Sequence, residues 1–292
     1  MTSRRAICVS RDRSLRGVVE PALASAGIAV EYCDGVPADT TGAVLVMVDR
    51  ATRQAAGDRL AAMTAPVVVV GDDLGDDGLI AAMLEAPVSH VVADPGDFDL
   101  GITSEKLASG DLFGLEKYLA PDTAVAERTI CGDADRRNAI GEVCAWAEAI
   151  GARRPIVHRL ASVADELMMN ALYDTPVASA PSAVLRWGAD DRVIVISVAD
   201  AFGALRQRDV IGHVRRARSE RGRPLPEVSD QRGAGIGFYL VLANVRSLVV
   251  NVEAGRRTEV VCIFDRTAPG RRAAPCARSL HVFQAAPRSA QS

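Results

Sequence analysis

The sequence is poor in lysine, in aromatic residues and in long hydrophobic runs. Its lysines are Lys106 and Lys117, so arginine carries nearly all of the positive charge, which we attribute to genome composition. Aromatic residues make up 4% of the chain, and none lies in the arginine-rich stretch 206–223, where base stacking would need them. The longest mainly apolar run, residues 61–70, is much shorter than the roughly 20 residues of a membrane span. With a net charge of −3, we expect neither nucleic acid nor a membrane as partner.

The sequence also lacks the cysteine and leader patterns of secreted or zinc-binding proteins. Its 6 cysteines include no CxxC pair, and no histidine follows them at zinc-finger spacing. The apolar stretch after the N-terminal arginines is too short for the core of a signal peptide. We therefore expect a reduced, cytoplasmic protein without a structural zinc.

The first hundred residues alternate between strand and helix patterns. Apolar strands are predicted at 6–10, 28–33, 42–49, 66–71 and 88–94, with helices at 14–27, through 59–63 and at 78–86. Nearly continuous Val and Ile runs separated by helices are typical of a parallel sheet that is covered on both faces. Residues 95–123 lack a sustained period, and we interpret them as an ordered connector.

The second half of the chain predicts a different arrangement. A strand at 125–131 and two helices, at 132–151 and from Pro155 onward, precede two hairpins, 182–190 with 192–200 and 248–254 with 258–265. A polar, arginine-rich loop at 206–223 and a helix entered through glycines separate these hairpins. Antiparallel strands followed by helices indicate an α/β two-layer sandwich.

Two polar side chains, Glu166 and Asn170, lie four residues apart in the segment 158–174. On a helix they project from the same face, one turn apart. A carboxylate can polarise a hydroxyl or water, and an amide oxygen can bind Mg²⁺. The alternative is the solvated side of an amphipathic helix. An adjoining apolar stripe would dock this helix on a sheet: Leu160, Val163, Ala164, Leu167 and Ala171.

Three further features follow in order along the chain. Asp200 and Gly203 stand at the end of a predicted strand, and Thr258 opens the last one. Between them a glycine motif enters a helix, which would let backbone N–H groups approach an anion. Singly these features also fit a turn-forming Asp and tight turns with close packing. The glycine motif consists of Gly233, Gly235 and Gly237.

As an ordered set, these residues resemble the motifs of the GHKL superfamily, which includes gyrase and the histidine kinases. The resemblance covers residues 122–266 and is greatest to the anti-sigma-factor, serine-kinase branch. It implies a two-layer α/β sandwich with a mixed, mainly antiparallel sheet, and it implies ATP and Mg²⁺ as cofactors. His158 lies on the same helix as Glu166, so we do not expect it to accept a phosphoryl group.

The resemblance also implies a role for each residue. Glu166 would be the general base, and Asn170 would hold Mg²⁺ against the phosphates. Asp200 would accept a hydrogen bond from the adenine amino group, with Thr258 contacting Asp200 or a nearby water. Backbone N–H groups at the glycines would approach the phosphates: Gly203, Gly233, Gly235 and Gly237.

The chain departs from the superfamily pattern in places. The family has Asp-x-Gly-x-Gly, whereas Asp200 is followed by a single glycine, displaced to position 203; Phe202 would then line the adenine pocket. Asp174 places an acid where relatives often carry a basic residue. We interpret the loop 206–223 as a solvated lid over the nucleotide. The more specific alternative is that Arg223 or Arg232 contacts a phosphate.

The N-terminal half resembles the receiver domain of two-component response regulators over residues 5–100. The resemblance implies a flavodoxin-like parallel sheet and puts Asp49 at the phosphoacceptor position. The residues that would hold metal and phosphate there are replaced, so we expect a degenerate receiver that docks or dimerises and is not phosphorylated. The replacements are Ser10, Arg11, Gly71 and Asp94.

We therefore predict an α/β protein with a receiver-like domain (1–100), a connector (101–121), a GHKL ATP-binding domain (122–266) and a tail (267–292). The tail is mostly flexible, with an edge strand at 279–283. The expected function is that of a cytoplasmic bacterial signalling protein that binds ATP and Mg²⁺ and phosphorylates or switches a protein partner. The alternative is a non-enzymatic adaptor that acts through the receiver-like surface. A homodimer is compatible with either.

Overall fold

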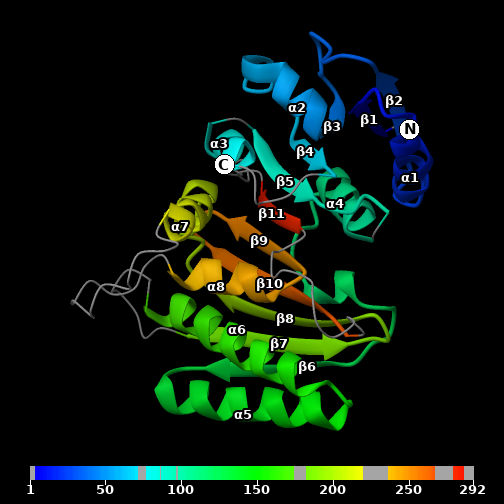
Figure 1. The fold of residues 1–292 in the computed structure, drawn as a ribbon. Coiled ribbons are helices and arrows are strands. Elements are labelled where there is room, and N and C mark those ends of the chain that lie inside the picture. Colours follow the sequence, from blue (N-terminus) through cyan, green and yellow to red (C-terminus); the bar gives the residue numbers. More distant parts are fainter. Residues whose placement is uncertain are drawn as a thin grey trace, which may run out of the picture. The chain divides into compact units, whose positions relative to one another are not determined.

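The computed structural model describes residues 4–71, 77–85, 87–96, 98–173, 182–219, 236–266 and 279–285. The chain divides into two compact units, Met1–Leu112 with Arg278–Phe283 and Phe113–Ala277 with Gln284–Ser292 (Figure 1). Helix α4 (Phe98–Ser109) belongs to the first unit, so the division falls at Leu112 and not at residue 100. The stretch 101–121, predicted as a connector, is thus shared between the two units.

The first unit is built on a parallel sheet with strand order β2-β1-β3-β4-β5, and β11 pairs antiparallel with β5. The predicted parallel sheet is confirmed. A strand is present at the predicted position 279–283, as β11, but it is not an edge strand, because the strand order gives it a neighbour on each side. The elements are β1 (Arg4–Val9), α1 (Arg13–Ala24), β2 (Ile28–Cys33), β3 (Ala43–Asp49), α2 (Arg50–Ala56), β4 (Val67–Val70), α3 (Asp77–Glu85), β5 (Val88–Val92), α4 and β11 (Ser279–Gln284).

The connections on either side of β3 differ from the regular strand–helix alternation. Residues 34–42 join β2 to β3 without a helix. After β3 the helix occupies 50–56, so the helix predicted through 59–63 is wrong. Asp49 explains the difference: its side chain accepts a hydrogen bond from the backbone N–H of Thr52 and caps α2 directly after the strand. Gly57, at φ +49°, then ends the helix.

Side chains of the inner strands β1, β3 and β4 are buried on both faces of the parallel sheet. Helices α1 and α4 pack against one face, where Cys8, Leu45 and Met47 belong to a single hydrophobic cluster. The alternating residues of β1 and β3, among them Ile7 and Val46, point the other way and are equally buried. This double coverage accounts for the unbroken apolar runs in the sequence.

The second unit carries an antiparallel sheet with strand order β9-β10-β8-β7-β6. Both predicted hairpins are confirmed as β7–β8 and β9–β10. The elements are a 3₁₀ turn η2 (Leu115–Tyr118), β6 (Val125–Ile130), α5 (Asp133–Ala149), α6 (Arg154–Tyr173), β7 (Ala183–Ala189), β8 (Val193–Asp200), α7 (Gln207–Ser219), α8 (Ile236–Asn244), β9 (Ser247–Glu253) and β10 (Arg257–Asp265).

Helix α6 lies at the centre of the helical layer of this unit. It packs on β7, β8 and β10, with α5 on one side and α8 on the other (Figure 1). The buried stripe predicted for α6 is confirmed, because each of its residues is at most 7% exposed: Leu160, Val163, Ala164, Leu167 and Ala171.

The arginine-rich stretch after β8 is not the loop that the sequence predicted. Residues 207–219 form α7, which packs against α8 and buries three apolar side chains. Val210, Ile211 and Val214 lie at helical spacing among the polar residues and are at most 3% exposed. Residues 207–219 therefore form a packed helix and not a loop, and the stretch beyond residue 219 lies outside the described residues.

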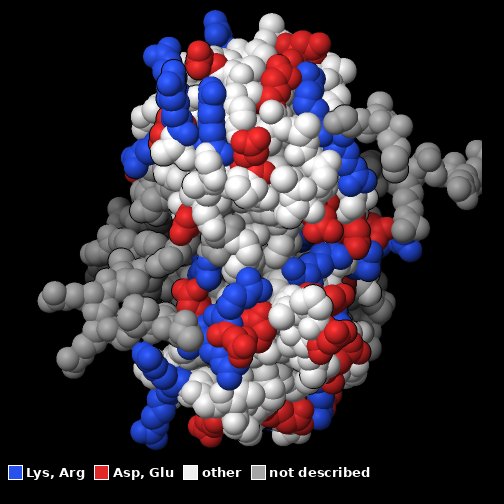
Figure 2. Space-filling view, turned by 90° about the vertical axis from the view of Figure 1, so that its right-hand side faces the viewer, with Lys and Arg blue, Asp and Glu red and all other residues white. Residues whose placement is uncertain are grey.

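The surface carries both signs of charge. Figure 2 shows Lys and Arg interspersed with Asp and Glu on the face in view. Charge pairs of this kind include Arg5 with Glu31 and Arg128 with Glu142. Among the described residues, no helix combines the length and apolar composition that crossing a membrane requires.

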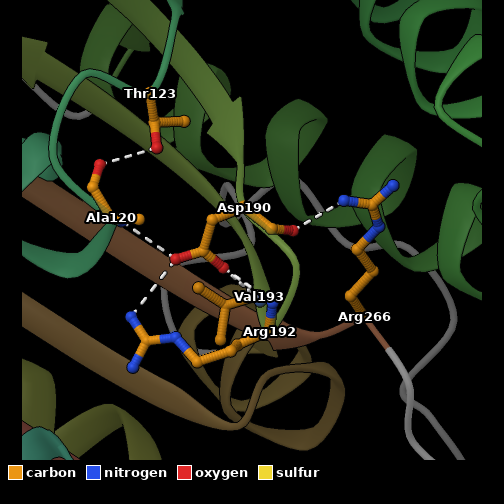
Figure 3. A network of polar contacts seen from close by, with 6 residues as sticks. All are labelled: Ala120, Thr123, Asp190, Arg192, Val193 and Arg266. Carbon is orange, nitrogen blue, oxygen red and sulfur yellow. Dashed lines mark hydrogen bonds and ion pairs between the residues drawn. The ribbon is translucent and has the colours of Figure 1, made fainter.

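The turn between β7 and β8 is fixed by Asp190 (Figure 3). Its Oδ1 accepts hydrogen bonds from the backbone N–H groups of Arg192 (2.8 Å) and Val193 (2.9 Å), and its Oδ2 accepts one from Ala120 (2.9 Å). Arg266, directly after β10, donates to the carbonyl oxygen of Asp190 at 2.6 Å. One side chain thus connects the β7–β8 turn with the segment that follows η2.

Candidate functional site

Glu166 of α6 lies directly against Gly237 in the first turn of α8. A Cβ atom placed on Gly237 would overlap Oε1 of Glu166 and would be 2.5 Å from its Cδ. Position 237 therefore accepts only glycine while Glu166 keeps its place. The carboxylate lies beside a helix N-terminus, where the helix dipole favours a negative charge. Two residues predicted from separate motifs are thus brought together.

Asn170 lies one turn further along α6 and is half-buried. Its Nδ2 is buried and has no hydrogen-bond partner among the described residues. A buried polar atom without a partner costs about 1–3 kcal/mol, which a ligand would relieve. Rotating the amide would put its oxygen in the same place, and that oxygen is a ligand that Mg²⁺ accepts.

Asp200 and Thr258 face each other across two neighbouring strands. They are directly paired in the register of β8 and β10. Oδ1 of Asp200 accepts hydrogen bonds from the backbone N–H groups of Phe202 (2.8 Å) and Gly203 (3.3 Å). Burial raises the pKa of Asp200, and these hydrogen bonds only partly oppose that rise. The hydroxyl of Thr258 is buried and faces this carboxyl: it falls short of full hydrogen-bond geometry, but Thr258 is among the groups that act to lower the pKa of Asp200.

Packing and backbone conformation both require a glycine at position 203. Its φ is +60°, and a Cβ there would overlap the carbonyl oxygen of Glu253 and come within 2.8 Å of the Gly255 nitrogen. Gly255 also donates a backbone hydrogen bond to Gly203 (3.2 Å). Gly203 thus fits closely against the β9–β10 turn, and its contact with a nucleotide stays a prediction.

Other predicted residues cannot be placed. Gly233 and Gly235 lie outside the described residues, as do Asp174, Arg223 and Arg232. The remaining residues form two pairs, Glu166 with Gly237 and Asp200 with Thr258. Helix α6, which carries Glu166 and Asn170, packs on both β8 and β10.

The sequence did not point to the contacts that hold α6 against α5. Arg136 of α5 forms an ion pair with Asp165, the neighbour of Glu166, and a second one with Asp133 at 3.3 Å. The hydroxyl of Tyr173 also donates to Asp133, at 2.9 Å. These residues are separated by up to 40 positions in the chain, so no local pattern could have identified them.

The described residues do not form a metal centre of their own. Within those ranges, no three His, Cys, Asp or Glu side chains gather closely enough to hold an ion. Asn170 can supply one oxygen ligand, so Mg²⁺ would need further ligands from water and from phosphate groups.

In the first unit, the side chain of Asp49 is engaged by its own surroundings. Its Oδ2 accepts a hydrogen bond from the hydroxyl of Ser10, and its Oδ1 accepts one from the N–H of Thr52 at 2.6 Å. Asp12 caps α1 through Ser14, whose hydrogen bonds lower the pKa of Asp12. Asp94 accepts a hydrogen bond from the N–H of Gly96. Both oxygens of Asp49 thus have donors within the protein.

A hollow of about 430 Å³ lies elsewhere, on the first unit between α1 and α4. Its walls include Val18, Pro21, Phe98 and Ile102, and it contains none of the residues predicted as functional. The candidate site is therefore formed by α6, α8, β8 and β10.

Neither a protein-family model nor a curated protein matches this sequence.

Proposed function

We propose that the second unit binds ATP with Mg²⁺ as a GHKL-type domain, and that the protein phosphorylates or switches a protein partner in bacterial signalling. The observation that carries the proposal is the contact between Glu166 and Gly237. Two motifs that are 71 positions apart meet there, one helical turn from Asn170, whose buried amide nitrogen lacks a partner among the described residues.

The side chains suit the roles that this function requires. Glu166, half-buried beside the start of α8, would accept the proton of an attacking hydroxyl or water. Asn170 would hold Mg²⁺ and Asp200 would accept a hydrogen bond from the adenine amino group. The backbone N–H groups at the start of α8 would hold phosphate oxygens. When bound, ATP would supply the phosphoryl group.

The first unit would act as a docking module of the flavodoxin-like, receiver type. Its order β2-β1-β3-β4-β5 is one of the two common doubly wound orders. Because Ser10 and Thr52 occupy both oxygens of Asp49, it would contribute a surface and not a phosphorylation site. This feature also supports the alternative, a nucleotide-binding adaptor without catalytic activity.

The proposed partner is a protein and not a nucleic acid. Acidic and basic side chains are interspersed in Figure 2, and the net charge is −3. A nucleic-acid partner would require an extended basic area. The proposed setting is the cytoplasm.

Calorimetry tests nucleotide binding directly. We expect ATP to bind more tightly with Mg²⁺ than with EDTA, and more tightly than GTP. Asp200→Asn should reduce the preference for ATP over GTP, whereas Asp191→Asn, at an exposed turn position of the same unit, should leave it unchanged. The absence of heat with ATP under both conditions would refute the proposal, and equal binding of ATP and GTP would refute the role of Asp200.

A further inference from the structure

Two histidines meet under β11 in the interior of the first unit. His281 of β11 is directly paired with His90 of β5, and their ring centroids are 5.6 Å apart. The ring of Phe283 lies 4.4 Å from that of His90 and 6.0 Å from that of His281. All three side chains are at most 1% exposed. The pairing of β11 with β5 therefore buries two titratable groups next to each other and against an aromatic ring.

Helix α4 completes this histidine cluster, which we define as His90, His281, Phe283, Thr103 and Lys106. The Thr103 hydroxyl lies 3.3 Å from Nδ1 of His281. The ammonium of Lys106, itself 1% exposed, lies 3.9 Å from the centre of the Phe283 ring. A buried positive charge thus already stands next to the two neutral rings, held partly by a cation–π contact.

The surroundings disfavour a second positive charge. The charged or titratable groups that act on the two rings are Lys106 of α4 and the rings themselves. Strand β4, on the other side of β5, consists of valines, and Asp99 is the buried carboxylate one turn before Thr103 on α4.

Each ring also keeps one buried nitrogen, His90 Nδ1 and His281 Nε2, without a hydrogen-bond partner among the described residues. A proton added to either atom would be buried without an acceptor. Burial and the neighbouring Lys106 accordingly lower the pKa of His281 to about 3. Burial, His281 and Lys106 lower that of His90 well below its usual value.

We propose that the histidine cluster makes β11 an acid-sensitive strand: β11 is docked on β5 while both rings are neutral, and protonation of either ring releases it. Released rings would regain an ordinary pKa near 6.5. The undocked form binds more protons below that pH, so docking is strongest above pH 6.5 and weakens as the pH falls. The undocked population should rise about tenfold per pH unit for each histidine.

Hydrogen exchange of the full chain between pH 7.5 and 5 tests this device. After correction for intrinsic exchange, protection of residues 279–284 should fall at least tenfold between pH 7 and 5.5. Protection of β1 and β3 in the same unit should persist. The double variant His90→Phe, His281→Phe retains flat rings and cannot titrate, so its β11 protection should not change with pH. His158→Phe, at an exposed position on α6, is the matched control and should behave like the wild type.

Three results would overturn the proposal. The first is unchanged β11 protection at pH 5.5 in the wild type, and the second is an equal loss in the double variant. The third is simultaneous loss of protection in β1, β3 and β11, which would mean unfolding of the whole unit. If the double variant does not fold at pH 7, NMR of the imidazole nitrogens in the wild type tests the proposal instead, because it follows the protonation of His90 and His281 directly. The two buried rings should then gain protons only as β11 loses its native signals.

Discussion

Glu166 and Asn170 stand one turn apart on α6, yet their substitution should have different consequences. Glu166→Gln keeps the shape of the side chain beside Gly237, so ATP affinity should change little. Turnover should fall by roughly 10²–10⁴-fold, the usual contribution of a positioned base. Asn170→Ala removes a metal ligand and should weaken binding and turnover together. Calorimetry and a phosphate-release or transfer assay measure the two effects.

The contrast between these variants separates a kinase from an adaptor. Both substitutions leave the buried stripe of α6 unchanged, so folding is not expected to obscure the comparison. A wild-type protein that binds ATP but, with every candidate partner, turns it over no faster than Glu166→Gln would leave only the adaptor.

Asp49 should not be phosphorylated. Its two oxygens accept hydrogen bonds from Ser10 and from the N–H of Thr52, and Asp12 is held as the cap of α1. An attacking carboxylate would have to give up both donors, and the end of β5 is followed directly by Ala93, Asp94 and Pro95, so no lysine stands there to stabilise the charge that develops. Incubation with acetyl phosphate and Mg²⁺ should therefore give no adduct in the intact mass. A phosphate adduct that disappears in Asp49→Asn would contradict this expectation.

Among the turns and helices, the β7–β8 connection offers a matched pair of neighbouring acids. The side chain of Asp190 is 6% exposed and accepts three backbone hydrogen bonds, whereas Asp191 is exposed. Asp190→Ala leaves these N–H groups without their acceptor and should lower the free energy of unfolding by about 1–3 kcal/mol. Asp191→Ala should change it by less than about 0.5 kcal/mol. Urea unfolding of the second unit measures both.

The effect of Asp190 should also depend on pH in a defined direction. Burial acts to raise the pKa of Asp190, but hydrogen bonds from Val193, Arg192 and Ala120 outweigh it, and the pKa lies below its usual 3.8. A lowered folded-state pKa adds stability above the unfolded value that is lost as the pH falls through the folded one. The difference between wild type and Asp190→Ala should therefore shrink below about pH 4. An unchanged difference at pH 2 would argue against the carboxylate as its source.

For the chain as a whole, the division into two units predicts that a nucleotide stabilises only one of them. Ligand at 100 times its Kd should raise the free energy of unfolding of the second unit by about 2.7 kcal/mol. The first unit should unfold at the same urea concentration with and without ATP and Mg²⁺. Hydrogen exchange of the backbone amides in β1 and β3 reports unfolding of the first unit, and exchange of the amides in β7 and β8 reports unfolding of the second. Equal stabilisation of both would show that the units do not unfold independently.

Much of the architecture was predictable because it rests on local periodicity. The apolar runs of β1, β3 and β4 and the buried stripe of α6 follow from spacing alone. The wrong predictions concern segments whose local composition disagrees with the structure that packing imposes. The polar composition of 207–219 hid the three apolar residues that make α7 a packed helix, and Asp49 started α2 earlier than the predicted helix.

Only the tertiary structure determined the contacts between residues that are distant in the chain. Sequence order suggested Glu166 and Gly237 as members of one set, but only folding puts the carboxylate where a Cβ on Gly237 would stand. Likewise, SLHVF could be recognised as a strand, whereas its partner β5 and the burial of His281 against His90 could not. The physical reason is that periodicity records which face of an element is buried, while the identity of the neighbour depends on how whole elements pack.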